Sequence, residues 1–315
     1  MDFLYAILGL VILVLAGDVL VRGAVNSSLR LGVPALIVSL TIVAVGTSAP
    51  ELLVAVQAVL EDAPGIALGN VVGSNIANVL LVLGIPALLA GLNTGACDSR
   101  DSYLQMIFGT VLFMVFAFMA PMNWLHGLAL LILYAGVMAH AVMVGSRHKK
   151  ANDLKLLEAE IDEVDPHMPW WKIFLYLALG LIGLPMGADM LVEGATNIAR
   201  AYSISETVIG LTLVAVGTSL PELATTIAAA FRRQADVALG NVIGSNMANS
   251  LGIIGVAALF GEIPVTNGLL GFDIWVMLGA AVLLAPFVLT RMNMGRLWGG
   301  LFTGLYVAYV VIVLM

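Results

Sequence analysis

Charged residues and cysteines are scarce in this sequence. Asp, Glu, Lys and Arg together make up 10% of the 315 residues, whereas soluble domains carry about 25%. Apolar residues reach 61% and the mean hydropathy is +1.06, so the chain cannot cover its surface with polar groups in water, and soluble folds are excluded. The single Cys97 excludes an intrachain disulfide and a cysteine-based metal cluster. Outside one short segment the sequence has no sizeable basic patch, so nothing in it points to a nucleic-acid partner.

Catalytic motifs are also missing. The sequence has no HExxH, and no repeated serine pairs with a histidine inside a predicted span. The four histidines lie outside the repeated polar motifs described below and are interpreted as ordinary surface or interface residues. We therefore expect no enzymatic activity and no cofactor, and no protein partner is evident.

Long apolar runs dominate the chain instead. A bilayer core needs about 20 apolar residues per helix, and polar breaks divide the sequence into ten such runs, which predicts an all-α polytopic membrane protein. The first run lacks a basic n-region and a cleavage site, so we expect a retained span rather than a signal peptide. The predicted spans cover residues 3–22, 34–59, 66–90, 103–120, 124–144, 171–198, 206–230, 236–260, 270–290 and 297–314.

Basic residues predict the orientation, because loops rich in Lys and Arg stay in the cytoplasm. Of the 13 Lys and Arg residues, 11 fall in alternate loops on one side, and only Arg200 lies opposite with Arg22 at a span end. Ten spans with both termini outside the cytoplasm explain this asymmetry. We expect a prokaryotic plasma (inner) membrane protein. The 11 residues are Arg30, Arg100, Arg147, Lys149, Lys150, Lys155, Lys172, Arg232, Arg233, Arg291 and Arg296.

The chain contains an internal repeat. Residues 40–88 align with residues 211–259 at a shift of 171 without a gap, with 26 identities in 49 positions. The predicted organisation is a five-helix repeat over residues 1–145, a polar cytoplasmic linker over 146–170, and a second five-helix repeat over 171–315. Since five spans reverse the chain direction, the two repeats have inverted topology, which in secondary transporters places the substrate site at mid-membrane.

The first repeated polar cluster holds two carboxylates. A charged carboxylate at the bilayer centre costs at least about 2.5 kcal/mol, and such residues usually mark an ion path. A buried ion pair or a protonated acid would be the alternative, but the spans offer no evident basic partner except Arg22 near one end. Proline within each cluster also frees a backbone carbonyl. The clusters are GTSAPE at residues 46–51, ending in Glu51, and GTSLPE at 217–222, ending in Glu222.

The second repeated cluster combines glycine, serine and asparagine: GNVVGSNIAN at residues 69–78 and GNVIGSNMAN at 240–249. For Ser74, Asn78, Ser245 and Asn249, ion ligation is favoured. For the four remaining asparagines (Asn70, Asn75, Asn241 and Asn246) ligation and helix–helix hydrogen bonding are equally plausible. A third repeated pair, Asp18 and Asp189, lies near span ends. These two residues either tune ion access or hydrogen-bond neighbouring helices, and the structural role is favoured. An all-oxygen set of carboxylates, hydroxyls, amides and carbonyls suits Ca²⁺ better than Mg²⁺, Cu⁺ or Zn²⁺.

These two linked motifs, each present twice, resemble the calcium/cation antiporter superfamily and, more closely, its prokaryotic sodium/calcium exchanger branch. The resemblance implies antiport of Ca²⁺ against Na⁺ by alternating access. It implies Ca²⁺ ligation by Glu51 and Glu222 with the backbone carbonyls of Thr47 and Thr218. It further implies Na⁺ sites that use the Ala44 and Ala215 carbonyls with Ser48, Ser219, Ser74 and Ser245, and a polar lining by Asn78 and Asn249.

One departure from the family pattern keeps alternatives open. Many members of this family carry an aspartate at one of the two positions that Asn78 and Asn249 occupy here, which leaves the coupling stoichiometry and any role of H⁺ or K⁺ undetermined. A proton-coupled or broader cation antiporter is the runner-up, and a passive cation channel is a third possibility.

Overall fold

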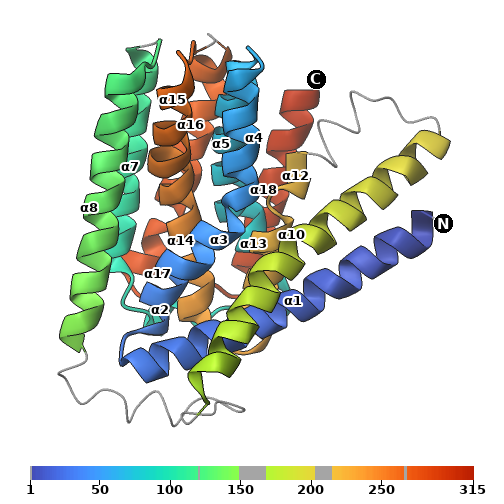
Figure 1. Ribbon diagram of the computed structural model, residues 1–315, viewed down its shortest axis with the longest axis vertical. Coiled ribbons are helices and arrows are strands. Elements are labelled where there is room, and N and C mark those ends of the chain that lie inside the picture. Colours follow the sequence, from blue (N-terminus) through green and yellow to red (C-terminus); the bar gives the residue numbers. More distant parts are fainter. Residues whose placement is uncertain (1, 120, 149–167, 203–214, 266–267) are drawn as a thin grey trace.

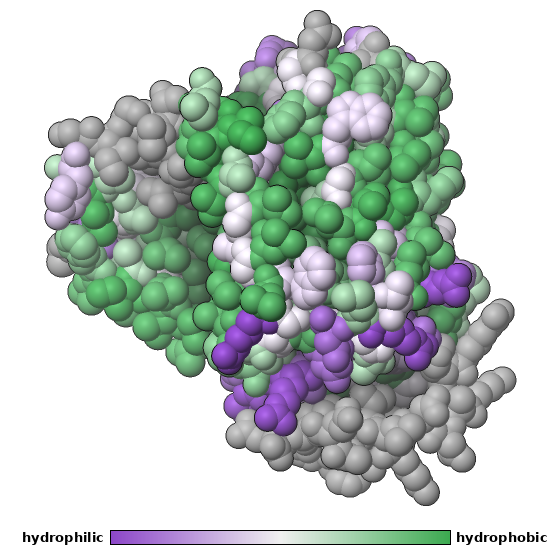
Figure 2. Space-filling view, turned by 180° about the vertical axis from the view of Figure 1, so that it is seen from behind, coloured by the Kyte–Doolittle hydropathy of each residue, from purple (hydrophilic) through white to green (hydrophobic). Residues whose placement is uncertain are grey.

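The protein is built from helices that lie in a membrane. The structure is a computed structural model that describes residues 2–119, 121–148, 168–202, 215–265 and 268–315. Within these ranges, eight helices are long and apolar enough to cross a bilayer, or nine if one bent pair counts as a single span. Apolar side chains cover most of the surface seen in Figure 2, and hydrophilic ones gather toward one end.

The helices follow the chain in the order shown in Figure 1. The first part contains α1 (Asp2–Leu31), α2 (Ala35–Val38), η1 (Ser39–Val43), α3 (Ala44–Thr47), α4 (Ala49–Leu60), α5 (Pro64–Ala77), η2 (Asn78–Val82), α6 (Gly84–Ala90), η3 (Thr94–Ala96), α7 (Arg100–Phe118) and α8 (Trp124–His148). The second part contains α10 (Trp170–Ala201), α12 (Ala215–Gly217), α13 (Leu220–Phe231), α14 (Ala235–Met247), η5 (Ala248–Ile253), α15 (Ile254–Phe260), η6 (Leu269–Asp273), α16 (Ile274–Leu283), α17 (Ala285–Leu289) and α18 (Arg296–Leu314).

The first helix is longer than the sequence predicts. The predicted span ends at residue 22, because polar residues follow, whereas α1 continues to Leu31. Two of the polar side chains bond within the helix: Asn26 Nδ2 donates to the Arg22 carbonyl at 2.8 Å, and Ser28 Oγ donates to the Val25 carbonyl at 2.7 Å. These local bonds satisfy the two donors, whereas Asn26 Oδ1 is buried without a partner in the described residues. The predicted span 206–230 lies partly outside the described residues, which contain α12 and α13 of it.

Helices α1 and α10 form an antiparallel pair that runs obliquely across the upright bundle (Figure 1). Glycines allow their backbones to approach closely. A Cβ on Gly187 would lie 2.8 Å from the Leu13 nitrogen, and one on Gly180 would lie 2.9 Å from the Leu20 Cα. Leu20 and Leu184 belong to a second hydrophobic cluster that also takes in Val38 and Val43, while Val21 of α1 belongs to the main core. The pair therefore packs closely on itself and also against the rest of the bundle.

The main core surrounds the two repeated motifs. The π-helical turns η2 and η5 continue helices α5 and α14. The spans that contain these helices are the most deeply buried of the described candidates, with 83% and 89% of their most apolar stretch buried. Short π-helical segments often occur at functional sites. In Figure 1, α14 and α5 stand inside the bundle, with α7 and α8 at one side and the α1–α10 pair at the other.

Candidate functional site

Two matching helix breaks build the centre of the molecule. In the first, α3 ends at Thr47 and α4 begins at Ala49, with a bend of 43° and with Ser48 at φ −85° and ψ 8°. In the second, Ser219 precedes α13 with φ −88° and ψ 3°. A proline follows each break within the first helical turn, where its missing N–H costs nothing. The sequence places each motif within one long span; the structure shows that Thr47 and Glu51 belong to separate helices.

The breaks bring two carboxyl groups to buried helix N-termini. Glu51 lies in the first turn of α4 and Glu222 in the first turn of α13, with side chains 1% and 0% exposed. The partial positive charge of a helix N-terminus favours a carboxylate there. Among the residues that the structure describes, neither glutamate forms a salt bridge. The two groups are close enough for their charges to interact.

Hydrogen bonds cross between the halves at this point. The Ser48 hydroxyl, three residues before Glu51, donates to Glu222 Oε1 at 3.1 Å, and Ser245 Oγ lies 3.5 Å from the same oxygen. Thr47 Oγ1 donates to Asn241 Oδ1 at 3.3 Å, and its repeat equivalent, Thr218 Oγ1, donates to Asn70 Oδ1 at 3.4 Å. Each half of the site is therefore held by the other.

A second layer of amides joins α5 to the α14–η5 unit. Asn78 Nδ2 donates to Asn246 Oδ1 at 3.1 Å, and Asn249 Nδ2 donates to Asn75 Oδ1 at 3.1 Å, so equivalent residues make equivalent bonds. Asn75 Nδ2 also donates to Ser250 Oγ at 2.6 Å. Of the asparagines left undecided by the sequence, Asn75 and Asn246 thus join helices, and Asn241 does so through Thr47.

Several buried oxygens in this centre have no hydrogen-bond partner in the described part of the chain. Buried polar groups are normally paired, and each exception needs an explanation. Here the exceptions include six residues that the sequence singles out, three from each half. They are Glu51 Oε2, Ser74 Oγ and Asn78 Oδ1 with Glu222 Oε2, Ser219 Oγ and Asn249 Oδ1.

One backbone carbonyl expected at the site already accepts a hydrogen bond. The Ala44 carbonyl accepts the Ser48 N–H at 3.0 Å, and the Thr47 hydroxyl, 3.3 Å away, can donate its one proton either there or to Asn241 Oδ1. In the other half, the Ser219 N–H donates to the Val216 carbonyl at 3.0 Å.

Two residues of the site escape the sequence analysis. Thr226 Oγ1 donates to the Glu222 carbonyl at 2.7 Å and accepts from Asn241 Nδ2 at 3.2 Å, and Ser250 accepts from Asn75. Their equivalents in the first half are Ala55 and Val79. A comparison that keeps only the polar residues shared by both copies of the repeat leaves these two residues out. They could have been found by also considering positions where only one copy has a hydroxyl side chain.

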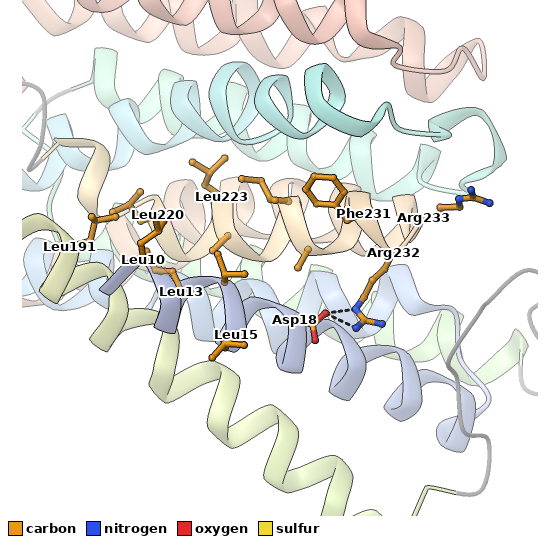
Figure 3. A pocket seen from close by; sticks show the side chains of 14 residues that line it. Leu10, Leu13, Leu15, Asp18, Leu191, Leu220, Leu223, Phe231, Arg232 and Arg233 are labelled. Atoms are coloured by element: carbon orange, nitrogen blue, oxygen red, sulfur yellow. Dashed lines mark hydrogen bonds and ion pairs between the residues drawn. The ribbon is translucent and has the colours of Figure 1, made fainter. Parts of the chain in front are cut away.

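In the third repeated pair, Asp18 binds two arginines, and Figure 3 shows its contact with Arg232. Its carboxylate accepts from Arg232 at 2.5 Å and pairs with Arg22 at 3.2 Å. Its equivalent Asp189 is exposed on α10.

Known proteins match this chain along nearly its whole length. The model of the family "Sodium/calcium exchanger protein" matches residues 1–143 and 172–315. The sodium/calcium exchanger MaX1 of Methanosarcina acetivorans is 34% identical over 99% of this chain and 98% of its own. The inner membrane protein YrbG of Escherichia coli is 32% identical over 96% of this chain and 94% of its own. A solved structure of the sodium-calcium exchanger NCX_Mj, soaked without Na⁺ and Ca²⁺, has a TM-score of 0.84 and 34% identity, covering 99% of this chain and 98% of that one.

Proposed function

Because this chain belongs to the sodium/calcium exchanger family, we propose that it exchanges Ca²⁺ for Na⁺ across a prokaryotic inner membrane by alternating access. The observation that carries the proposal is the pair of buried glutamates from opposite halves, each with an unpartnered Oε2 and, among the described residues, no salt bridge. In the described residues no three His, Cys, Asp or Glu side chains could jointly hold a metal ion. Neutral oxygens must therefore complete the shell of a cation bound between the glutamates.

The proposed ligand set follows the orphan oxygens. Glu51 and Glu222 hold Ca²⁺ together with the backbone carbonyls of Thr47 and Thr218, which end the helical segments before each break. This all-oxygen shell suits Ca²⁺, which takes six to eight oxygen ligands. The amide oxygens of Asn78 and Asn249, which have no hydrogen-bond partner in the described residues, form the polar lining beside it.

Sodium ions occupy flanking positions in this proposal. Ser48, Ser74, Ser219 and Ser245 supply hydroxyls, and Ala44 and Ala215 supply carbonyls. The Ala44 oxygen already accepts the Ser48 N–H, so one of its two lone pairs remains for Na⁺ when the Thr47 hydroxyl donates to Asn241 Oδ1.

Shared ligands couple the two fluxes. With both glutamates ionised, the empty site carries two negative charges in a poorly solvated place, and moving it bare across the barrier is costly. Either Ca²⁺ or Na⁺ offsets that charge, but both compete for the same oxygens. Exchange rather than leakage follows from this competition.

The proposed architecture is ten spans in two inverted repeats, residues 1–145 and 171–315, joined by a cytoplasmic linker over 146–170, with both termini outside the cytoplasm. The matching breaks at Ser48 and Ser219 and the matching asparagine bonds support it. In this scheme the α1–α10 pair, whose backbones approach closely at glycines, moves against the fixed centre.

Calcium uptake into proteoliposomes, driven by an imposed Na⁺ gradient, tests the site. Glu51→Gln and Glu222→Gln should each lower uptake by roughly a hundredfold or more, because removing one partner of a buried charge pair costs about 3–5 kcal/mol. Glu61→Gln is the matched control, since Glu61 is an exposed glutamate at the end of the same helix. Near-normal uptake by either site variant refutes the ligand assignment.

The same vesicles separate the alternatives. Uptake that follows a pH gradient and ignores Na⁺ would indicate a proton-coupled antiporter. Calcium flux that needs no counter-ion and does not saturate would indicate a channel.

A further inference from the structure

Four of the buried asparagines at the centre form two matched pairs. Asn249 Nδ2 donates to Asn75 Oδ1, and Asn78 Nδ2 donates to Asn246 Oδ1, both at 3.1 Å. All four side chains are at most 3% exposed. The nitrogen and oxygen of an amide lie on two branches of one planar group, so an amide that uses its nitrogen in this bond directs its oxygen elsewhere. The two donors, Asn249 and Asn78, are also the two whose Oδ1 has no hydrogen-bond partner in the described residues.

The orientation of each donor amide matters for a cation. An amide oxygen attracts a cation, whereas an amide NH₂ group carries only donors and repels it. If Asn249 were reversed, it would keep its hydrogen bond only if Asn75 reversed with it, because Asn75 would then have to donate. The group that fixes Asn75 therefore also decides which end of Asn249 faces a bound ion.

Asn246 and Asn75 are fixed by different groups. Asn246 Nδ2 donates to the backbone carbonyl of Asn75 at 3.4 Å. A carbonyl only accepts, so the orientation of Asn246 does not depend on another side chain. Asn75 Nδ2 instead donates to a side chain, Ser250 Oγ, at 2.6 Å. The first half has Val79 at the position equivalent to Ser250 and offers no such hydroxyl there.

The thioether of Met277 fixes the direction of the bond between Asn75 and Ser250. A serine hydroxyl can donate or accept, so on its own it allows either orientation of the amide. Met277 Sδ lies 3.6 Å from the same Asn75 nitrogen, and a thioether only accepts, weakly. Both neighbours therefore accept from the NH₂ group of Asn75, and Ser250 is the stronger acceptor of the two.

We propose that Ser250 is a positioning residue of the exchange site. By holding the NH₂ group of Asn75, it keeps Asn75 Oδ1 toward Asn249, which directs Asn249 Oδ1 rather than the NH₂ group toward the cation. The inference rests on the proposed function, in which the oxygens of Asn78 and Asn249 form the polar lining of the site. Since a backbone carbonyl fixes Asn246, the Asn78 side needs no such hydroxyl.

Equilibrium binding of radiolabelled Ca²⁺ to the purified full-length protein, in detergent without Na⁺, tests the proposal. Ser250→Ala should weaken Ca²⁺ binding about fivefold, because the loss of one hydrogen bond makes the reversed amides more accessible by that factor. Asn249→Asp removes the need for orientation, since a carboxylate presents an oxygen either way. In the Asn249→Asp background, Ser250→Ala should therefore change the affinity by less than about twofold, the usual limit for uncoupled sites.

Ser39→Ala is the matched control. Ser39 is also a buried serine, but its hydroxyl donates to the backbone carbonyl of Val237 and orients no amide. This variant should bind Ca²⁺ as the wild type does. Unchanged affinity in Ser250→Ala, or an equal loss in the two backgrounds as expected from a merely structural role, overturns the proposal. A wild-type protein that binds no Ca²⁺ would overturn the proposed function itself, so the two failures are distinct.

Discussion

In the proposed exchange site, the hydrogen-bond partners of each buried oxygen decide whether that oxygen is available to bind an ion. Ser39 and Ser74 are both buried serine hydroxyls, 0% and 3% exposed, but they differ in their partners. Ser39 Oγ donates to the Val237 carbonyl at 2.7 Å, whereas Ser74 Oγ has no partner in the described structure. The Ser39 hydroxyl therefore joins two helices, whereas in the proposed function the Ser74 hydroxyl binds an ion.

We expect Ser74→Ala to weaken ion binding without destabilising the protein. An unpaired buried hydroxyl costs about 1–3 kcal/mol, so its removal should leave the ion-free melting temperature unchanged or slightly higher. The rise of that temperature on adding Na⁺ or Ca²⁺ should shrink, because bound ligand stabilises in proportion to its affinity. Thermal unfolding in detergent, with and without ions, measures both.

Ser39→Ala serves as the comparison. It removes a made hydrogen bond and should lower the melting temperature in both conditions while keeping the ion-induced rise. A full ion response in Ser74→Ala would contradict the proposed role of this hydroxyl.

At the scale of elements, the sequence predicts which segments matter better than how they bend. The repeated motifs identify Glu51 and Glu222, because a carboxylate in an apolar run is exceptional. The break at Ser48 was not predicted, since proline in a helical pattern is compatible with a kink, a start or an interruption. The length of α1 is not predicted either. The bonds that Asn26 Nδ2 and Ser28 Oγ donate to earlier carbonyls form only in a helical backbone, so the sequence does not show them.

Close packing of α1 on α10 makes a direct prediction. Gly187→Ala should destabilise the protein, because the new Cβ would meet the Leu13 nitrogen at 2.8 Å and the Gly9 carbonyl oxygen at 2.9 Å, both of them backbone atoms. Overpacking of this kind costs about 1–3 kcal/mol, so the melting temperature should fall by several degrees. Gly136→Ala in α8 is the control, since no described atom lies within 4 Å of its added Cβ. Equal melting temperatures for the two variants would show that the pair is looser than described.

For the whole molecule, composition suffices to predict a helical membrane protein, and the repeat suffices to relate its halves. Ten spans and their inverted arrangement remain a proposal, because the described residues contain only α12 and α13 of the predicted span 206–230. Charge counts predict which loops face the cytoplasm. An experiment that distinguishes the two sides of the membrane tests this prediction. Asp62 and Arg233 are equivalent positions for which inversion predicts opposite sides.

The only cysteine makes that prediction measurable in the native background. Cys97 is buried, and burial, with Asp236 beside it, raises the pKa of its thiol well above the ordinary value. Since the thiolate is the reactive form, an impermeant maleimide should leave the native protein unlabelled at neutral pH. In intact cells Asp62→Cys should be labelled from outside, and Arg233→Cys only after permeabilisation. Labelling of both from outside would exclude inverted repeats.

The bonds from Ser48 to Glu222, from Asn78 to Asn246 and from Asn249 to Asn75 join the two halves of the chain. Under the proposed function, neither half alone therefore holds the complete set of cation ligands. A protein severed within residues 146–170 would yield two fragments, each with one glutamate and half of the asparagine contacts. Expressed alone, neither fragment should retain Ca²⁺. Expressed together, they should reassociate through the polar groups that lack partners in the separate fragments, and exchange should be restored. Recovery of exchange would therefore report on the hydrogen bonds between the two halves.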